Sequence, residues 1–423
     1  MDRFVIEGGK ILKGSVTASG AKNSVLPILA ASIMAKGASV IHSVPDLQDV
    51  RTMLKILQYL GAKVSFKNGT VEVDPQAVNK NDAPYEFVKT MRASISLLGP
   101  MLARSGKAKF SLPGGCIIGP RPIDLHIKGL QKLGVDIKIE DGYVIAETKG
   151  KLKGDYIFLG GAFGSSVLAT ANVMCAAAVA KGTTVIEFAA CEPEISDLAN
   201  FLVKMGARIE GIGSPCLVIK GVKSLRGAEH RVIPDRIETG TFLLAGAITR
   251  GCVAVEKCQP IHLGAFLEKM SETGIEICAG KDFIEIKGKN EWKSTDVVTL
   301  AYPGFPTDLQ AQMMAFLSLA DGVSIITEKV FPERFIHVGE LNRLGASISL
   351  DGSKAIVKGV KNLFGARVMA SDLRASAALV LAGLAAEGTT HISRIYHLFR
   401  GYHKFEEKLM SLGAEIKREK DTI

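Results

Sequence analysis

The chain alternates between two kinds of apolar segment, and this alternation occurs six times. In the first kind, an amphipathic stretch ends at a glycine, which follows an apolar residue in five of the six repeats, and a run of alternating apolar and polar positions comes next. Because glycine adopts the left-handed conformation without a Cβ penalty, this pattern predicts a helix that ends at the glycine and a strand after it. The six glycines lie about 70 residues apart, at Gly61, Gly134, Gly206, Gly274, Gly345 and Gly413.

The second kind of segment is rich in Ala, Leu and Gly, has few charges, and also leads through a glycine into a predicted strand. It occurs once in each repeat, at 31–44, 100–112, 175–188, 244–257, 315–328 and 381–394. Each repeat is therefore predicted to be a βαβ-type unit with additional strands, and the sparsely charged helices are expected inside a ring of sheets. Six units could form one ring or two rings of three. The chain length favours two globular halves with a ligand site in the cleft between them.

Composition narrows the class of protein. Of the 423 residues, 47% are hydrophobic and 22% are charged, which is ordinary for a globular protein. No apolar stretch reaches the roughly 18–20 residues of a membrane helix and the N-terminus has no signal-like apolar region, so we expect no membrane contact and a cytoplasmic location. The cysteines and histidines show no metal-ligand spacing, so no metal or other cofactor is predicted. The net charge of +9 is dispersed, which favours anionic small substrates over nucleic acid.

Polar residues interrupt the apolar pattern at the start of each sparsely charged helix. Ser and Asp in this place, such as Ser166 and Asp235, are typical N-caps. A cation there opposes the helix dipole, but the cation and the unpaired N–H groups of the helix start both attract an anion. Such cations recur, which predicts anion binding by Lys22, Arg92, Arg236 and Arg374.

The loops that follow the next strands also carry candidate chemistry. In the second repeat a Gly/Pro-rich loop places Cys116 before Arg121, which predicts a lid with a thiol whose pKa the nearby cation lowers. Equivalent loops of the last two repeats carry Arg334, Arg394 and Arg400.

Two further patterns have plainer interpretations. Cys175 and Cys252 fall in apolar stretches and are expected in the core. The segment GGAFGSS (160–166) follows a predicted strand and precedes a helix, so it could bind phosphate through backbone N–H groups or be an ordinary turn.

Several motifs together resemble the UDP-N-acetylglucosamine 1-carboxyvinyltransferase family over essentially the whole chain. They are SGAKNS (19–24), PGGCIIGPRPIDLHI (113–127), EPEI (192–195), PDRIETGTFL (234–243), PGFPTDLQAQ (303–312), RFIHV (334–338), DLRASAALVLAG (372–383) and RIYHLFRGY (394–402). The resemblance implies an α/β fold, the two-domain inside-out α/β barrel of enolpyruvyl transferases, with three of the six repeats in each domain. One domain would span 22–233 and include a lid loop at about 112–122; the other would join 1–21 to 234–423, and the active site would lie in the interdomain cleft.

The family's reaction transfers the enolpyruvyl group of phosphoenolpyruvate to the 3′-hydroxyl of UDP-N-acetylglucosamine and releases phosphate, the first committed step of peptidoglycan biosynthesis. By resemblance, Asp308 is the general base and Cys116 is a proton donor that can bond to phosphoenolpyruvate and is the expected site of the inhibitor fosfomycin. Lys22 and Arg400 complete the expected catalytic set. The residues expected to bind phosphoenolpyruvate are Lys22, Asn23, Arg121, Arg334, Arg374 and Arg400. Those expected to bind the nucleotide sugar are Asn23, Arg92, Arg121, Pro122, Ile123, Asp124, Leu125, Gly164, Ser165, Ser166, Asp308 and Val330.

The chain departs from the family pattern in three places without losing a candidate residue. Leu168 stands where the family usually has glycine, Pro332 and Glu333 precede Arg334 in place of Glu-Asn, and Gln48 stands where some members have lysine.

Two alternatives to this function are weighed. A 5-enolpyruvylshikimate-3-phosphate synthase shares the fold and mechanism, but Lys22-Asn23 and Cys116 speak against it. A catalytically inactive nucleotide-sugar sensor would be favoured by the loss of Cys116, Asp308 or Lys22, and all three are present.

Overall fold

The computed structural model describes residues 2–88, 91–111 and 123–420, and these residues form two compact units. The described residues between Gly20 and Ile233 make up the central unit. The terminal unit joins the stretch that ends at Ser19 to the stretch that begins at Pro234.

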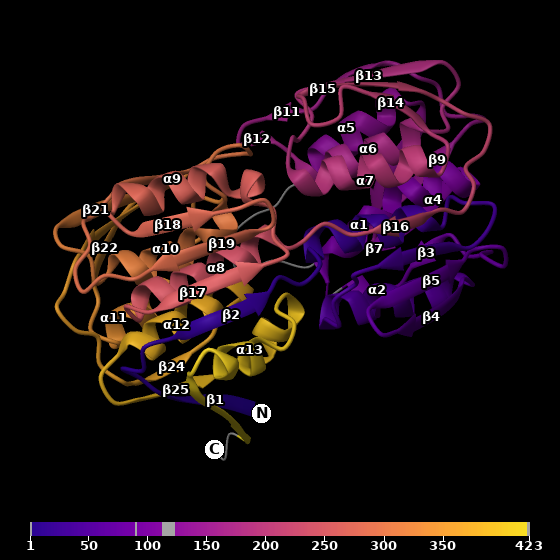
Figure 1. Ribbon diagram of the computed structural model, residues 1–423. Coiled ribbons are helices and arrows are strands. Elements are labelled where there is room, and N and C mark those ends of the chain that lie inside the picture. Colours follow the sequence, from indigo (N-terminus) through magenta and orange to yellow (C-terminus); the bar gives the residue numbers. More distant parts are fainter. Residues whose placement is uncertain (1, 89–90, 112–122, 421–423) are drawn as a thin grey trace. The chain divides into compact units, whose positions relative to one another are not determined.

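The central unit contains three four-stranded sheets and one short hairpin. Its strands are β3 (Ser39–His42), β4 (Lys63–Lys67), β5 (Thr70–Asp74), β6 (Asp82–Ala83), β7 (Lys107–Ser111), β8 (Val135–Glu140), β9 (Tyr143–Thr148), β10 (Tyr156–Phe158), β11 (Gly160–Gly161), β12 (Gly164–Ser165), β13 (Thr183–Glu187), β14 (Arg208–Glu210), β15 (Cys216–Lys220) and β16 (Glu229–Arg231). The sheets have the strand orders β16-β3-β5-β4, β6-β7-β9-β8 and β10-β13-β15-β14, and β11 pairs with β12 (Figure 1).

The terminal unit contains three more four-stranded sheets. Its strands are β1 (Asp2–Glu7), β2 (Lys13–Thr17), β17 (Cys252–Glu256), β18 (Glu276–Ala279), β19 (Phe283–Lys287), β20 (Val297–Thr299), β21 (Val323–Glu328), β22 (Ser347–Asp351), β23 (Lys354–Lys358), β24 (Arg367–Met369), β25 (Thr389–Ser393) and β26 (Glu415–Lys420). Their orders are β18-β19-β17-β2, β20-β21-β23-β22 and β24-β25-β1-β26.

All six four-stranded sheets share one design. Each has a single parallel pair, and its other neighbouring strands are antiparallel. The prediction of six related repeats, three in each unit, is therefore confirmed. Within the described residues the sheets remain separate and do not close into one hydrogen-bonded barrel.

The first strand of the chain completes the last sheet. β1 lies antiparallel between β25 and β26, so that Phe4 is paired with Ile392 on one side and with Arg418 on the other. The second strand, β2, pairs in parallel with β17. The terminal unit is therefore assembled from both ends of the chain.

Two kinds of helix accompany the sheets, as the sequence predicts. The helices of the central unit are α1 (Lys22–Ser32), α2 (Gln48–Leu60), α3 (Tyr85–Val88), η1 (Arg92–Leu97), α4 (Leu98–Ser105), α5 (Asp124–Lys132), α6 (Val167–Ala177) and α7 (Pro193–Lys204). Those of the terminal unit are α8 (Arg236–Ile248), η2 (Pro260–Leu263), α9 (Gly264–Glu272), η3 (Thr307–Leu309), α10 (Gln310–Leu317), α11 (His337–Arg343), α12 (Leu373–Ala385), η4 (Ile395–Arg400) and α13 (Phe405–Ser411).

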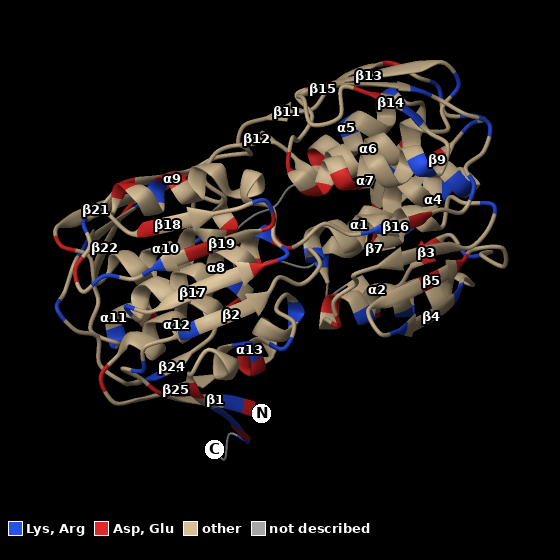
Figure 2. Ribbon diagram, in the orientation of Figure 1, with Lys and Arg blue, Asp and Glu red and all other residues tan. Residues whose placement is uncertain are grey.

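The sparsely charged helices form the core of each unit. Every residue of α8 and α10 is buried, and α1, α6 and α12 are buried along almost their whole length. Figure 2 shows that charged residues gather on the strands, the loops and the other helices, whereas α6 carries none. A helix without a polar face must be covered on all sides, which explains why the sheets lie outside these helices.

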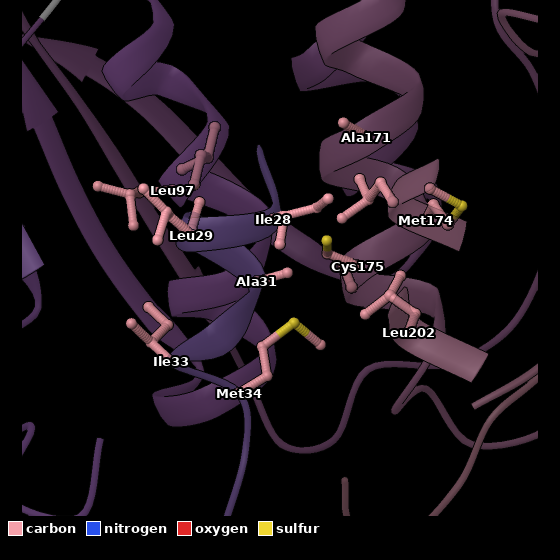
Figure 3. Packing of buried hydrophobic residues seen from close by; sticks show 14 of the residues in the cluster. Ile28, Leu29, Ala31, Ile33, Met34, Leu97, Ala171, Met174, Cys175 and Leu202 are labelled. Atoms are coloured by element: carbon pink, nitrogen blue, oxygen red, sulfur yellow. The ribbon is translucent and has the colours of Figure 1, made fainter. Parts of the chain in front are cut away.

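Small side chains allow these helices to pack closely. In the central unit, Figure 3 shows Ile28 and Ala31 of α1 directed toward Ala171 and Cys175 of α6. Cys175 is buried, as predicted, and burial raises the pKa of its thiol to about 12. Cys252 is only half-buried on β17, so the prediction that it is a core residue is wrong.

The amphipathic helices end where the sequence predicts. All six repeat glycines are left-handed, with φ between +86° and +108°. Each follows one of the helices α2, α5, α7, α9, α11 and α13. A glycine in this conformation ends the helix and directs the chain into the next strand.

No helix among the described residues is both long enough and apolar enough to cross a membrane.

Candidate active site

The predicted cations lie at the starts of the core helices. Lys22 is the first residue of α1, Arg92 the first of η1, and Arg236 the first of α8, while Arg374 is the second residue of α12. Asn23 follows Lys22, and the Lys22 Nζ lies 3.8 Å from a carboxylate oxygen of the buried Asp49. Each unit therefore presents cations beside helix N–H groups, an arrangement that attracts anions.

Three of the acidic and hydroxyl residues at these helix starts are N-caps. Asp235 accepts hydrogen bonds from the backbone N–H groups of Ile237 and Glu238, at 2.8 and 3.0 Å. Asp372 caps α12 in the same way, and Ser166 caps α6 through a single longer contact of 3.4 Å. The structural interpretation of these residues as caps is therefore correct.

Asp308 behaves differently, because its carboxylate accepts hydrogen bonds from two arginine side chains. Arg334 Nη1 donates to one of its oxygens at 2.9 Å, and Arg374 Nη2 donates to the other at 2.7 Å. The two arginine side chains are almost completely buried, whereas a quarter of the Asp308 side chain is exposed. We call this group of Asp308, Arg334 and Arg374 the Asp308 clamp.

The clamp is held in place by polar neighbours. Arg334 also donates to the hydroxyl of Thr307 at 3.1 Å, and this hydroxyl donates to Glu328 at 2.8 Å. The same Glu328 accepts the backbone N–H of Val330, a predicted nucleotide-sugar residue, at 2.9 Å. Val330 is thereby connected to the Asp308 clamp inside the terminal unit.

Electrostatics favour the charged form of the clamp. Burial alone would lower the pKa of Arg374, but Asp308, Tyr402 and Asp235 outweigh it and raise that pKa above its ordinary value. Gln312 Nε2 donates to the Asp308 carbonyl oxygen and to the Tyr402 hydroxyl, both at 3.0 Å. Because a quarter of its side chain is exposed, the Asp308 carboxylate can accept a proton from a hydroxyl that reaches this exposed side.

In the central unit, the start of α5 and the β11–β12 hairpin lie together. Asp124 and Leu125 are the first residues of α5, with Ile123 at the N-cap position. A Cβ added to Gly161 would lie 3.1 Å from the Leu125 Cδ1 atom, so the hairpin approaches this helix closely. Gly164 has φ of +93° and, with Ser165, forms strand β12 just before the Ser166 cap.

Two buried polar residues beside this region, Asn172 and His126, are missed by the sequence analysis. Asn172 lies in the middle of α6 with no exposed surface, and its side chain contacts Gly99, Ile95 and His126. The only signal in the sequence is an amide within an otherwise apolar segment. We call Asn172 with these three partners the Asn172 junction.

Other predicted residues are placed more simply or not at all. Arg400 is the last residue of η4, and Leu168 is the second residue of α6 and is half-buried. Cys116, Arg121 and Pro122, with the predicted lid loop at 112–122, lie outside the described residues. Among the residues that are described, no group of three or more His, Cys, Asp or Glu side chains could hold a metal ion.

Comparison with known proteins decides the family. The model of the EPSP synthase (3-phosphoshikimate 1-carboxyvinyltransferase) family matches residues 6–409. A UDP-N-acetylglucosamine 1-carboxyvinyltransferase from Methylacidiphilum infernorum is 53% identical over 418 residues, which are 99% of each chain. One from Desulfosudis oleivorans is 52% identical over the same length and coverage. The chain belongs to the UDP-N-acetylglucosamine 1-carboxyvinyltransferase family.

Solved structures agree with this family's fold. The enolpyruvyl transferase NikO from Streptomyces tendae has a TM-score of 0.89 at 26% identity and covers 99% of this chain and 98% of its own. An EPSP synthase from Acinetobacter baumannii has a TM-score of 0.77 at 18% identity and covers 99% of this chain and 100% of its own, which shows a shared fold alone. The predicted enolpyruvyl transferase fold is therefore confirmed.

Proposed function

We propose that this chain transfers the enolpyruvyl group of phosphoenolpyruvate to the 3′-hydroxyl of UDP-N-acetylglucosamine and releases phosphate. The observation that supports this most strongly is the full-length likeness, at 52–53% identity, to proteins named for this reaction. The reaction would be the first committed step of peptidoglycan synthesis and would serve cell-wall growth, cell shape and division. Both substrates are charged and cross membranes poorly, so we place the reaction in the cytoplasm.

The addition step requires two proton transfers, and the elimination step requires a third. The sugar oxygen forms a bond to C2 of phosphoenolpyruvate and loses its proton, while C3 of the enol gains one. The tetrahedral intermediate then loses the C3 proton and phosphate to regenerate the enol ether. Asp308 is proposed as the base for the sugar hydroxyl, because its carboxylate is oriented by two arginines and remains partly exposed.

The cations would balance the charge of phosphoenolpyruvate and of the intermediate. Lys22, Arg121 and Arg400 are proposed to bind the phosphate, and Arg92, Arg334 and Arg374 to stabilise the carboxylate and the intermediate. Arg334 and Arg374 already contact Asp308, so they would position the base as well as supply charge. The nucleotide sugar is assigned to Asn23, Arg92, Arg121, Pro122, Ile123, Asp124, Leu125, Gly164, Ser165, Ser166, Asp308 and Val330.

Cys116 is proposed as the proton donor to C3 and as the site of fosfomycin. Alkylation followed by peptide mass spectrometry should modify Cys116 before the other six cysteines, and fosfomycin should prevent this labelling. Equal labelling of several cysteines would contradict the proposal that Cys116 is the most reactive thiol.

The reaction is tested by measuring phosphate release. Purified protein is mixed with phosphoenolpyruvate and UDP-N-acetylglucosamine, and in parallel with phosphoenolpyruvate and shikimate 3-phosphate. Release with the nucleotide sugar alone is expected. Release with shikimate 3-phosphate alone, or none with either acceptor, would overturn the proposal.

A further inference from the structure

The Asn172 amide has a fixed orientation. Its Oδ1 accepts the backbone N–H of Gly99 at 2.6 Å, and its Nδ2 donates to the carbonyl oxygen of Ile95 at 3.0 Å. If the amide were turned over, an NH₂ group would face an N–H and a carbonyl would face a carbonyl. Both of these contacts are repulsive, so the NH₂ group occupies the position found here.

This orientation determines where His126 carries its proton. The second hydrogen of Asn172 Nδ2 points to His126 Nδ1, 2.9 Å away. Because Nδ2 can only donate, Nδ1 must be the unprotonated nitrogen of the ring. The neutral ring then carries its proton on Nε2, which has no partner among the residues that the structure describes. Burial, and secondarily the nearby Arg92, lower the pKa of His126 to about 3, so the ring is neutral near pH 7.

Close helix packing brings the junction together. A Cβ added to Gly99 would lie 2.1 Å from the Asn172 carbonyl oxygen, and one added to Gly129 of α5 would lie 2.4 Å from a methyl group of Val173. Two glycines therefore allow α4 and α5 to approach α6 closely enough for these hydrogen bonds. An amide in the middle of α6 would otherwise be costly to bury.

The elements that meet at Asn172 carry several of the proposed nucleotide-sugar residues. Arg92 begins η1, which runs directly into α4; Asp124 begins α5; and Ser166 caps α6. His126 follows two residues after Asp124 and is 5% exposed. A shift of any of these helices would separate the groups proposed to bind one ligand.

We propose that Asn172 is a positioning residue for nucleotide-sugar binding, which holds η1, α5 and α6 in register and fixes His126 in the tautomer with its proton on Nε2. The Nε2–H group of His126, a residue close enough to Arg92 to feel its charge, is then a neutral donor suited to an oxygen of an anion, and the diphosphate is the anionic part of UDP-N-acetylglucosamine. This inference rests on the proposed function.

The tautomer is tested in the unmodified protein. The ¹⁵N spectrum of histidine rings is recorded at pH 7, and His126 is assigned among the eight histidines as the ring lost in His126→Gln. We expect the pattern of an unprotonated Nδ1 and a protonated Nε2, and a change at Nε2 when UDP-N-acetylglucosamine is added. A ring protonated on Nδ1 would overturn the inference, whatever the variants show.

The positioning role is tested with Asn172→Asp, which keeps the size of the side chain but removes both donor hydrogens. The KM for UDP-N-acetylglucosamine should rise roughly 10- to 100-fold, as expected when a hydrogen bond to a charged group is lost, while the KM for phosphoenolpyruvate changes less than about threefold. The His126 signal should also move to a form protonated on Nδ1. If Asn172→Asp does not fold, His126→Gln is measured in its place and should raise the KM for UDP-N-acetylglucosamine. The matched control for this variant is His391→Gln on β25, which should leave that KM unchanged.

The outcomes separate this inference from the proposed function. If the unmodified protein fails to bind UDP-N-acetylglucosamine in a calorimetric titration, the proposed function fails. If it binds and both variants bind within twofold of it, the positioning role of Asn172 is overturned while the proposed function stands. Equal increases of both KM values would indicate a purely structural role and would also overturn it.

Discussion

The Asp308 clamp of the terminal unit is made of charged side chains, whereas the Asn172 junction of the central unit is made of neutral ones. In the clamp, two buried guanidiniums share one carboxylate, and each charge depends on the others. In the junction, one amide satisfies two backbone groups and one imidazole. Removing one charge from the clamp leaves others uncompensated, while removing one donor from the junction leaves neutral groups unpaired.

The largest effect is expected from Asp308→Asn in the clamp. Turnover should fall by about 10²-fold or more because the amide cannot accept the hydroxyl proton, and the free energy of unfolding should fall by about 1–3 kcal/mol because two buried cations lose their counter-charge. Steady-state kinetics and chemical denaturation measure the two effects, with the exposed Asp351→Asn on β22 as control. Near-normal turnover would exclude Asp308 as the base.

Two glycine-to-alanine substitutions, one in each unit, compare how tightly the helices of the two units pack. In the central unit, Gly99→Ala would press a methyl group against the Asn172 backbone, and we expect it to cost about 2–3 kcal/mol of unfolding free energy. In the terminal unit, the methyl group of Gly240→Ala would meet the side chain of Leu309, which can shift, so a cost of about 1 kcal/mol or less is expected. Equal costs in thermal or urea unfolding would show that helix packing is no tighter at the junction than beside the clamp.

Buried histidines make both units sensitive to acid. Burial lowers the pKa of His126 to about 3, and burial together with Arg334, against the opposing effect of Asp372, lowers that of His337 in the terminal unit to about 4. Since unfolded histidine binds a proton near pH 6.5, the unfolded chain binds more protons below that pH, and stability falls as the pH falls.

The measurement is the difference in unfolding free energy between pH 7 and pH 5. Each histidine should contribute a loss of about 2 kcal/mol over this range, which His126→Gln or His337→Gln should remove. The loss should continue to about pH 3 for His126 but end at about pH 4 for His337. A variant with the same pH dependence as the unmodified protein would show that the histidine in question is not held neutral.

The helix caps of the two units are expected to differ in strength. Asp235→Ala in the terminal unit should cost about 1–2 kcal/mol, because two backbone N–H groups lose their acceptor. Ser166→Ala in the central unit should cost only about 0.5 kcal/mol, because its contact is a single long one. If Ser166 also binds the nucleotide sugar, its substitution should raise that KM with little change in unfolding temperature; a large loss of stability would favour capping as its only role.

The repeats and helix ends could be predicted from the sequence because they depend on local rules. Gly61 and its five counterparts are left-handed since only glycine enters that conformation without strain, and the sparsely charged helices are buried since they have no polar face. The position of Asp235 at a helix start is enough to predict that it is a cap. Predicting these features does not require knowing which residues far apart in the sequence contact one another.

The side-chain clusters could not be predicted because their members are far apart in sequence. Asp308 and Arg374 are separated by 66 residues, and His126 and Asn172 by 46. Asp308 and Asp372 both lie at helix starts, yet Asp372 caps its helix and Asp308 accepts hydrogen bonds from two arginines. The prediction for Cys252 is wrong because an alternating strand pattern leaves open which face of the strand is buried.

The pairing of β1 with β25 and β26 imposes an order on biosynthesis. Phe4 is translated before the central unit, whereas its partners Ile392 and Arg418 are translated after it, so β1 cannot pair until both later strands have been made. At ~5–20 residues per second, translating residues 234–420 takes roughly 10–40 s, during which the complete central unit can fold. A ribosome that stalls before β25 would release a chain with one finished unit and an unpaired N-terminal strand, which is a template for aggregation.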